Sequence, residues 1–250
     1  RLHKTGKQMI TYKLLTNKGE RGINEDSIGV ARNKDLYCFI LADGLGGHGG
    51  GDLASASVVK TIQDYFSQNG EFSQQCIENC IMQAQNKLLE VQERMNKTNE
   101  MKTTLVILIM DEKKALWGHV GDSRLYHFFG KKQWTRTRDH SVPQMLVELG
   151  EIKESEIRGH EDRNRVLKVL GTEWDTPQYE IDQPVMLTGG KDSFLLCTDG
   201  FWELVEEKVM LKTLKHAPDM EKWLLKMEEY LWKIGRGSNM DNYSAIAIRV

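Results

Sequence analysis

The sequence predicts an α+β domain in which helices and strands form separate layers. Two helix-patterned segments stand early in the chain and two stand late, and the stretch between them is rich in strand patterns. No repeat, low-complexity tract or Pro/Ser-rich linker divides the 250 residues. We therefore expect a single domain over residues 1–250, large enough to bury about 70–75% of its unfolded surface.

In the first part of the chain we predict strands over 9–16, 27–31 and 37–42, and helices over 52–67 and 73–95. Glycines 19 and 22 mark the turn between the first two strands. The continuous apolar character of the third strand is typical of a strand buried on both faces. Apolar residues of the second helix recur every three or four positions, which predicts one core-facing stripe: Ile77, Ile81, Ala84, Leu88 and Val91.

The middle and the end of the chain carry most of the strand patterns. We predict an antiparallel meander over 103–110, 115–120, 124–129 and 133–135, because turn residues separate these runs. Residues 140–171 are polar, with short helical stretches, and indicate an insertion or flap over the sheets. Within this segment we predict a strand over 166–169. After it we predict strands over 178–186 and 194–198, helices over 201–214 and 218–234, and a last strand over 243–250.

The composition excludes several classes of function. The chain has 34 Lys and Arg against 36 Asp and Glu, a formal net charge of -2, whereas a general nucleic-acid binder is strongly basic. The longest apolar run, residues 105–110, is far shorter than the ~20 residues that span a bilayer. The four cysteines form no CxxC pair, which favours a reducing, cytoplasmic compartment. No long apolar stripe demands a dimer, so we expect a monomer.

Acidic residues stand at the predicted ends of several strands. Asp43-Gly44 and Asp199-Gly200 each end an apolar strand, and glycine there lets a ligand approach the backbone closely. Further acids at strand ends are Glu25, Asp26, Asp122 and Asp241. Any one of them is commonly a turn residue. If their strand ends meet at one edge, the carboxylates would raise one another's pKa unless hard divalent cations neutralise them. The residues alone leave both interpretations open.

The glycine-rich loop over 43–51 does not fit a nucleotide site. It lacks the Gly-Lys-Ser/Thr of a P-loop, and it begins with an acid where a phosphate cradle needs none. The scarcity of neighbouring His and Cys likewise argues against zinc.

Seven motifs together carry a resemblance to a known family. They are Arg21-Gly-Ile-Asn-Glu-Asp26, Leu41-Ala-Asp-Gly-Leu-Gly-Gly-His48, Thr103-Thr104, Gly118-His-Val-Gly-Asp-Ser-Arg124, Asp139-His-Ser141, Cys197-Thr-Asp-Gly200 and Asp241-Asn242. In this order and rough spacing the chain resembles the metal-dependent Ser/Thr phosphatases of the protein phosphatase 2C type, and it looks most like their compact bacterial members. The match runs from about residue 21 to the C-terminus.

The resemblance implies a sandwich of two antiparallel sheets flanked by helix pairs, with residues 140–171 as its flap. It implies two Mn²⁺ or Mg²⁺ ions at one end of the sandwich. Asp43 would bridge the two ions and Gly44 would offer its carbonyl oxygen. Asp199 and Asp241 would hold the first ion.

The remaining site residues follow from the same resemblance. Glu25 and Asp26 would serve the second ion, partly through bound waters. Asp122 would bind a third, weaker ion together with Asp199. Arg21 would bind the phosphate oxygens through its planar guanidinium, the alternative being a surface salt bridge.

The implied activity is hydrolysis of phosphoserine and phosphothreonine on proteins by direct attack of a metal-bridging water or hydroxide. The implied partners are phosphoproteins, with a cognate bacterial Ser/Thr kinase among them or acting on them. A catalytically silent phosphoprotein-binding scaffold of the same fold is the alternative. Leu45 stands where many eukaryotic members carry a His, so the proton donor is either His48 or a bound water. Arginines 158, 163 and 165 form either a phosphopeptide contact or a solvated charged face.

Overall fold

The computed structural model describes residues 9–46, 50–98, 100–130 and 133–250. Its strands are β1 (Thr11–Asn17), β2 (Asp26–Asn33), β3 (Leu36–Leu45), β4 (Lys102–Thr103), β5 (Leu105–Met110), β6 (Lys114–Val120), β7 (Arg124–Phe129), β8 (Gln133–Arg136), β9 (Glu180–Ile181), β10 (Val185–Met186), β11 (Asp192–Cys197) and β12 (Tyr243–Arg249). Its helices are α1 (Gly51–Asn69), α2 (Gln74–Met95), α3 (Val142–Glu148), α4 (Asp199–Trp202), α5 (Glu207–His216), α6 (Met220–Gly235) and the 3₁₀ helix η1 (Glu154–Gly159).

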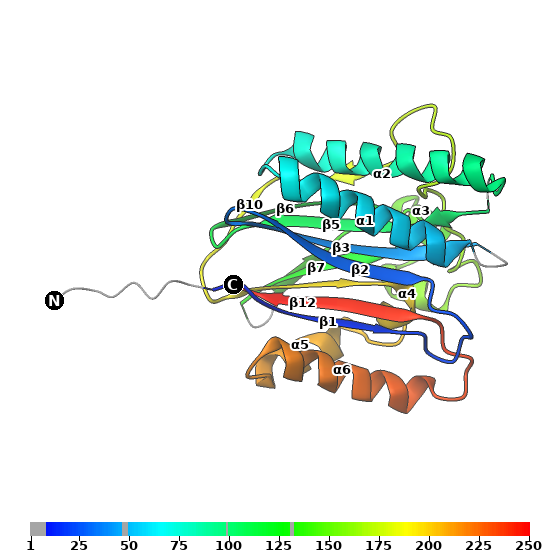
Figure 1. Ribbon diagram of the computed structural model, residues 1–250. Coiled ribbons are helices and arrows are strands. Elements are labelled where there is room, and N and C mark those ends of the chain that lie inside the picture. The colour runs from blue at the N-terminus through cyan, green and yellow to red at the C-terminus, as the bar shows by residue number, and fades with distance from the viewer. Residues whose placement is uncertain (1–8, 47–49, 99, 131–132) are drawn as a thin grey trace.

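The strands form two antiparallel sheets. One has the order β1-β12-β11-β7-β8; the other has the order β10-β6-β5-β3-β2, with β4 beside β3 and β9 beside β6. Helices α1 and α2 cover one outer face of this sandwich, and α5 and α6 cover the other (Figure 1). The α+β class and the helix-flanked sandwich expected from the sequence are therefore confirmed.

Local sequence explains where the long helices begin and end. The Ser73 hydroxyl accepts a hydrogen bond from the Cys76 amide at 3.1 Å and so caps α2. Asn96 ends that helix in the left-handed region, with a φ of 52°. At α6, the carboxylate of Asp219 caps the first turn by accepting from the Lys222 amide at 2.7 Å.

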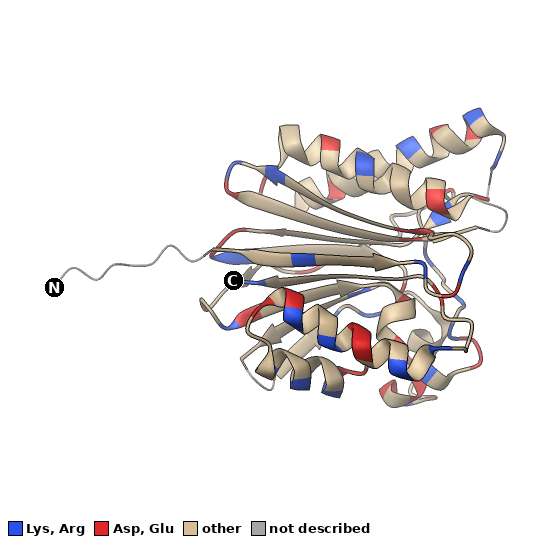
Figure 2. Ribbon diagram, turned by 60° about the horizontal axis from the view of Figure 1, so that its bottom comes forward, with Lys and Arg blue, Asp and Glu red and all other residues tan. Residues whose placement is uncertain are grey.

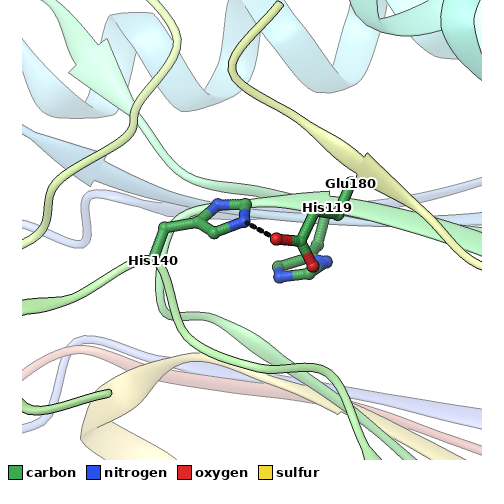
Figure 3. A group of neighbouring side chains, drawn as sticks. All are labelled: His119, His140 and Glu180. Atoms are coloured by element: carbon green, nitrogen blue, oxygen red, sulfur yellow. Dashed lines mark ion pairs between the residues drawn. The ribbon is translucent and has the colours of Figure 1, made fainter. Parts of the chain in front are cut away.

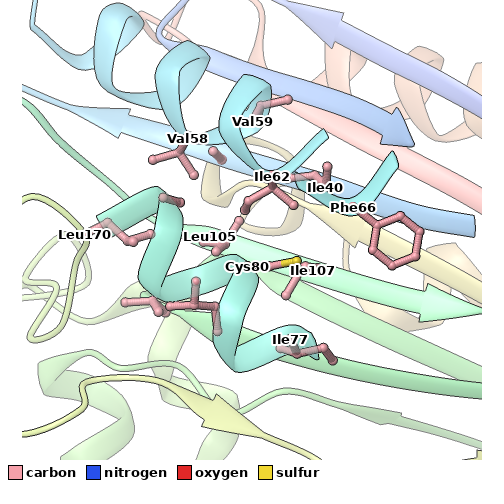
Figure 4. Packing of buried hydrophobic residues seen from close by; sticks show 14 of the residues in the cluster. Ile40, Val58, Val59, Ile62, Phe66, Ile77, Cys80, Leu105, Ile107 and Leu170 are labelled. Carbon is pink, nitrogen blue, oxygen red and sulfur yellow. The ribbon is translucent and has the colours of Figure 1, made fainter. Parts of the chain in front are cut away.

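Alternating side chains divide the core into three layers. In β3, Ile40 and Ala42 pack under α1 and α2, whereas Phe39 and Leu41 pack between the two sheets. Figure 4 shows the outer layer, where Cys80 of α2 lies against the sheet. Both faces of β3 are thus buried, as its unbroken apolar pattern predicts.

The second sheet repeats this division. Ala245 and Ala247 of β12 face α5 and α6, and Ile246 and Ile248 face the space between the sheets. All four cysteines are buried and free. Of the helices that the structure describes, none has the combined length and apolar character that crossing a membrane requires.

The prediction of one meander over 103–135 is wrong. Strands β5 and β6 pair within the seven-stranded sheet, whereas β7 and β8 belong to the five-stranded sheet. The chain changes sheets at residues 121–123, where Gly121 has a φ of +101° that favours glycine. Turn residues mark where a strand stops but not which sheet the next strand joins, so the pattern did not reveal the crossing.

Three other element boundaries differ from the predictions. Residues 166–169 form no strand and contribute only an isolated bridge from Val166 to Ser141. The strand over 178–186 is split into β9 and β10, since Pro184 between them has no amide to donate to a ladder. The helix over 201–214 is two helices, because the extended backbone of Glu206 separates α4 from α5.

Candidate metal centre

The acidic residues at strand ends meet at one end of the sandwich. Asp26 begins β2 and lies opposite Asp43 near the end of β3 in the antiparallel register. Asp199 follows β11, and Asp241 stands just before β12, the neighbour of β11. The loop that joins β1 to β2 lies at this same end, and the C-terminus lies at the other (Figure 1). Antiparallel neighbours therefore bring together acids that are far apart in the sequence.

A pocket of about 740 Å³ opens among these residues. Its lining contains most of the predicted site: Arg21, Glu25, Asp43, Gly44, Asp199 and Asp241. Asp26 and Asp122 lie behind the pocket and are only 7% and 2% exposed. Figure 2 shows the acidic segments of the strand ends and loops at this end of the sheets.

The backbone near Gly44 is packed so closely that only glycine fits. A Cβ on Gly44 would lie 2.1 Å from the Gly51 carbonyl oxygen and 2.6 Å from that of Glu25. A Cβ on Gly51 would in turn lie 2.7 Å from the Glu25 carboxylate. The segments that contain Gly44 and Gly51 therefore pack directly against each other and against Glu25.

Two threonines hold the backbone of Asp43. The Asp43 amide donates to Oγ1 of Thr104 at 3.0 Å, and its carbonyl oxygen accepts from Oγ1 of Thr103 at 2.8 Å and from the amide of Thr104 at 2.9 Å. Because these bonds occupy both backbone groups, the Asp43 side chain is the part left to face the pocket.

Asn242 holds the opposite wall. Its side-chain amide donates to the carbonyl oxygens of Lys18 and Ile23, each at 2.9 Å, and its oxygen accepts from the Glu25 amide at 2.8 Å. This one side chain fixes the loop that carries Arg21 and Glu25. Asn242 lies in the last of the seven motifs but was not among the predicted site residues; its position next to Asp241 was the available signal.

Burial and mutual repulsion raise the pKa values of the acids in this cluster. Burial, and then the charge of Asp199, raise the pKa of Asp43 well above its usual range. Burial, and then the charge of Asp241, raise the pKa of Asp199. The side chains of Asp43 and Asp199 lie close enough that each affects the pKa of the other.

The two acids behind the pocket, Asp26 and Asp122, also have raised pKa values. Burial raises the pKa of Asp26 to about 8, although Thr198 donates a hydrogen bond to its Oδ2 at 3.0 Å. Burial and the charge of Asp199 raise the pKa of Asp122 well above its usual value. Oδ1 of Asp26 and Oδ2 of Asp122 are both buried without a hydrogen-bond partner. Such orphaned oxygens fit a site whose cations would complete their coordination.

Arg21 is the cation that lines the pocket. Its guanidinium donates to Oδ2 of Asp241 at 3.0 Å, and both side chains are about half exposed. Arg21 thus forms a surface ion pair at the pocket and lies within reach of any anion that enters.

The structure also identifies acids that sequence reasoning missed. Asp52, in the first turn of α1, has a buried and unpartnered Oδ1, and its charge helps raise the pKa of Glu25. Burial and the charge of Asp199 raise the pKa of Glu203 to about 7. Glu203 lies one helical turn after Asp199, which was the only signal available. His48, one predicted candidate for the proton donor, lies outside the described residues.

Each arginine of segment 140–171 forms an ion pair: Arg158 with Glu207 at 2.8 Å, Arg163 with Glu203 at 3.4 Å and Arg165 with Asp162 at 3.2 Å. The interpretation as a charged face therefore fits better than a preformed phosphate contact.

Comparisons with known proteins show which sequences this chain resembles. Residues 18–234 match the family model described as Protein phosphatase 2C. The chain is similar to the serine/threonine phosphatase stp of Listeria innocua, with 30% identity over 240 residues that cover 93% of each protein.

Solved structures agree as well. The crystal structure of the serine/threonine phosphatase Stp1 from Staphylococcus aureus has a TM-score of 0.86 at 26% identity, and the match covers 97% of this chain and 95% of that one. The catalytic domain of the phosphatase PstP, solved in complex with two manganese ions, has a TM-score of 0.80 at 24% identity over 96% of this chain and 97% of its own. At that identity the second match shows a shared fold.

Proposed function

Since the chain belongs to the protein phosphatase 2C family, we propose that it is a metal-dependent phosphatase that hydrolyses phosphoserine and phosphothreonine on proteins. The observation that carries the proposal is the buried carboxylate cluster with orphaned oxygens at the floor of an open pocket. A silent scaffold would not need to keep so many acids together against their mutual repulsion.

We propose the metal ligands that the family resemblance implies, and the lining of the pocket supports them. Asp43 would contribute to the sites of both Mn²⁺ or Mg²⁺ ions, and the Gly44 carbonyl oxygen would add a ligand. Asp199 and Asp241 would hold the first ion, and Glu25 would hold the second.

Asp26 would support the second ion from behind the pocket. Asp122, together with Asp199, would hold a third and weaker ion; its buried and unpartnered Oδ2 supports this assignment. Oxygen ligands of this kind suit Mn²⁺ and Mg²⁺ and exclude the softer metals.

The residues of the chain would have separate roles in this reaction. When bound, the ions would lower the pKa of a water and orient it toward phosphorus. Arg21 leaves Asp241 and binds two phosphate oxygens through its fork, which holds the ester in line with that water. The four cysteines are buried within the core, which supports direct hydrolysis over a cysteine phosphoenzyme.

We place this activity in one domain over residues 1–250, with residues 140–171 as a flap beside the site. Its free cysteines support a reducing, cytoplasmic compartment. A bacterial Ser/Thr kinase would supply the phosphorylated substrates, and we propose that the phosphatase acts as a monomer.

The test is hydrolysis of p-nitrophenyl phosphate and of a phosphothreonine peptide with Mn²⁺, with and without EDTA. We expect turnover with Mn²⁺ and none in EDTA. Full activity in chelator would contradict the metal mechanism. Inactivity at saturating Mn²⁺, with the phosphopeptide still bound, would establish the scaffold alternative.

A further inference from the structure

A second group of titratable side chains lies outside the lining of the pocket: His119, His140 and Glu180 (Figure 3). The two imidazole rings stack with their centroids 4.5 Å apart. Nε2 of His119 lies 2.6 Å from the Arg138 carbonyl oxygen, which only accepts, so this nitrogen carries the proton. The three donor groups lie within 4.8 Å of one another, the spacing of a metal site.

Hydrogen bonds nevertheless argue against a cation there. Nδ1 of His140 accepts from the Gly121 amide at 3.1 Å, so the proton of the neutral ring is on Nε2. Nε2 of His140 lies 3.2 Å from the carboxylate of Glu180. A protonated Nε2 has no lone pair for a metal. The group of three is therefore held together by the stacking of the two rings and by the contact of His140 with Glu180, whereas Nδ1 of His119 is buried without a hydrogen-bond partner.

We propose that His140 is a positioning residue for Asp122, and that through it the ends of segment 140–171 set the affinity of the third metal ion. This inference rests on the proposed function, because Asp122 matters only if a third ion binds.

His140 holds both backbone groups of the residue before Asp122. The Gly121 amide donates to the His140 ring at 3.1 Å, and the Gly121 carbonyl oxygen accepts from the His140 amide at 2.9 Å. On the other side, Gly121 is so close to Thr104 that a Cβ would lie 2.6 Å from its side chain. The turn is therefore fixed from two directions, and so is the direction in which the Asp122 carboxylate points.

His140 also joins the two ends of segment 140–171. Its carbonyl oxygen accepts from the Leu167 amide at 2.7 Å, and the next bond of this short ladder runs from the Val142 amide to the Arg165 carbonyl oxygen at 3.0 Å. A displacement of the segment would act on the His140 backbone and hence on Gly121. Asp122 is thus connected to the segment through one residue.

Three variants separate this role from simple packing. His140→Ala removes the acceptor for Gly121. His140→Asn keeps it, because the Asn Oδ1 occupies the position of Nδ1, but it has no atom at Nε2. Glu180→Ala is the matched control, since it removes only the contact at Nε2.

Calorimetric titration of the metal-free protein with Mn²⁺ measures the binding steps directly. Hydrogen exchange of the peptide that contains Gly121 measures the turn. We expect His140→Ala to weaken the weakest Mn²⁺ step by about tenfold, the effect of leaving a buried amide without its acceptor, and to speed exchange at Gly121. His140→Asn should restore both properties, and Glu180→Ala should match the wild type.

Unchanged Mn²⁺ affinity in His140→Ala would overturn the proposal, as would a wild-type protein that binds only two Mn²⁺ ions. An additional effect of His140→Ala in an Asp122→Asn background would show that it acts elsewhere. If His140→Ala does not fold, a His140→Asn variant with weakened binding and rapid exchange overturns the proposal by itself. These readouts need no turnover, so an inactive wild type contradicts the proposed function and leaves the positioning role to be decided by binding.

Discussion

The molecule contains two buried charged regions that differ in their balance of charge. Around Arg124, every charge has a partner: its guanidinium donates to both oxygens of Asp139 at 2.8 and 2.6 Å and to the Tyr126 hydroxyl at 3.0 Å. In the metal centre, Asp26 and Asp122 each keep a buried oxygen without a partner. The buried charges of the first region are paired within the chain, whereas the second keeps buried carboxylate oxygens without partners, as expected of a site that cations would complete.

This comparison shows that burial of charge alone does not identify a functional site. The plane of Arg124 also stacks on Trp202 at 3.4 Å, and Arg158 neutralises the nearby Glu207 at 2.8 Å. A balanced network of this kind holds structure in place. A cluster of one sign, left unbalanced where a pocket opens, indicates a ligand of the opposite sign.

The largest expected effect is on the unbalanced region. Asp43→Asn should lower kcat by about 1,000-fold or more, because ions at this site contribute several kcal/mol of charge stabilisation in the transition state. The unfolding temperature of the metal-free protein should not fall, since one repelling charge is removed. Near-normal turnover of the phosphopeptide by the Asp43→Asn variant would show that the unbalanced acids are not needed for catalysis.

The balanced region should respond in the opposite way. Asp139→Asn leaves the buried Arg124 with a neutral partner and should destabilise the protein by about 3–5 kcal/mol in urea unfolding. Asp64→Asn is the control, because its ion pair with Lys60 is exposed and should contribute under about 0.5 kcal/mol. Equal effects of the two substitutions would remove the distinction between the regions.

The pH dependence of stability sharpens the comparison further. Asp26 has a folded pKa of about 8, whereas its unfolded pKa is about 3.9. Across that window the folded state holds the proton and the unfolded state does not, so the stability of the metal-free protein falls as the pH rises. Melting temperatures measured in EDTA from pH 5 to 8 should decrease, and Asp26→Asn should flatten the trend. A rise with pH in the parent protein would contradict the assignment.

The smallest expected effect is at the pocket rim. Arg21→Ala should lower kcat/KM for a phosphothreonine peptide by about tenfold, mostly through KM, since a charge-assisted contact to phosphate contributes about 1.4 kcal/mol. Arg21→Lys should recover part of this loss, as it keeps the charge without the fork. Unchanged kcat and KM in the alanine variant would remove the role of Arg21.

The sequence was most informative where a single local pattern determines the structure. The apolar run before Asp43 predicted a strand buried on both faces, and the Asp-Gly pairs marked the strand ends that meet at the pocket. The sequence was least informative where a contact between residues far apart in the chain determines the structure. Nothing local indicates that the chain changes sheets at Gly121, or that Asn242 holds the loop of Glu25. Those features depend on which strands become neighbours, and periodicity does not encode that choice.

The division of the acids between the two sheets has a mechanical consequence. Asp26 and Asp43 belong to β2 and β3 of one sheet, whereas Asp199 and Asp241 adjoin β11 and β12 of the other. Ions bound by acids of both sheets would connect the two sheets at one end of the sandwich. Binding of Mn²⁺ should then slow amide exchange in both sheets together. The same ions would both activate the enzyme and stabilise the packing of its two sheets.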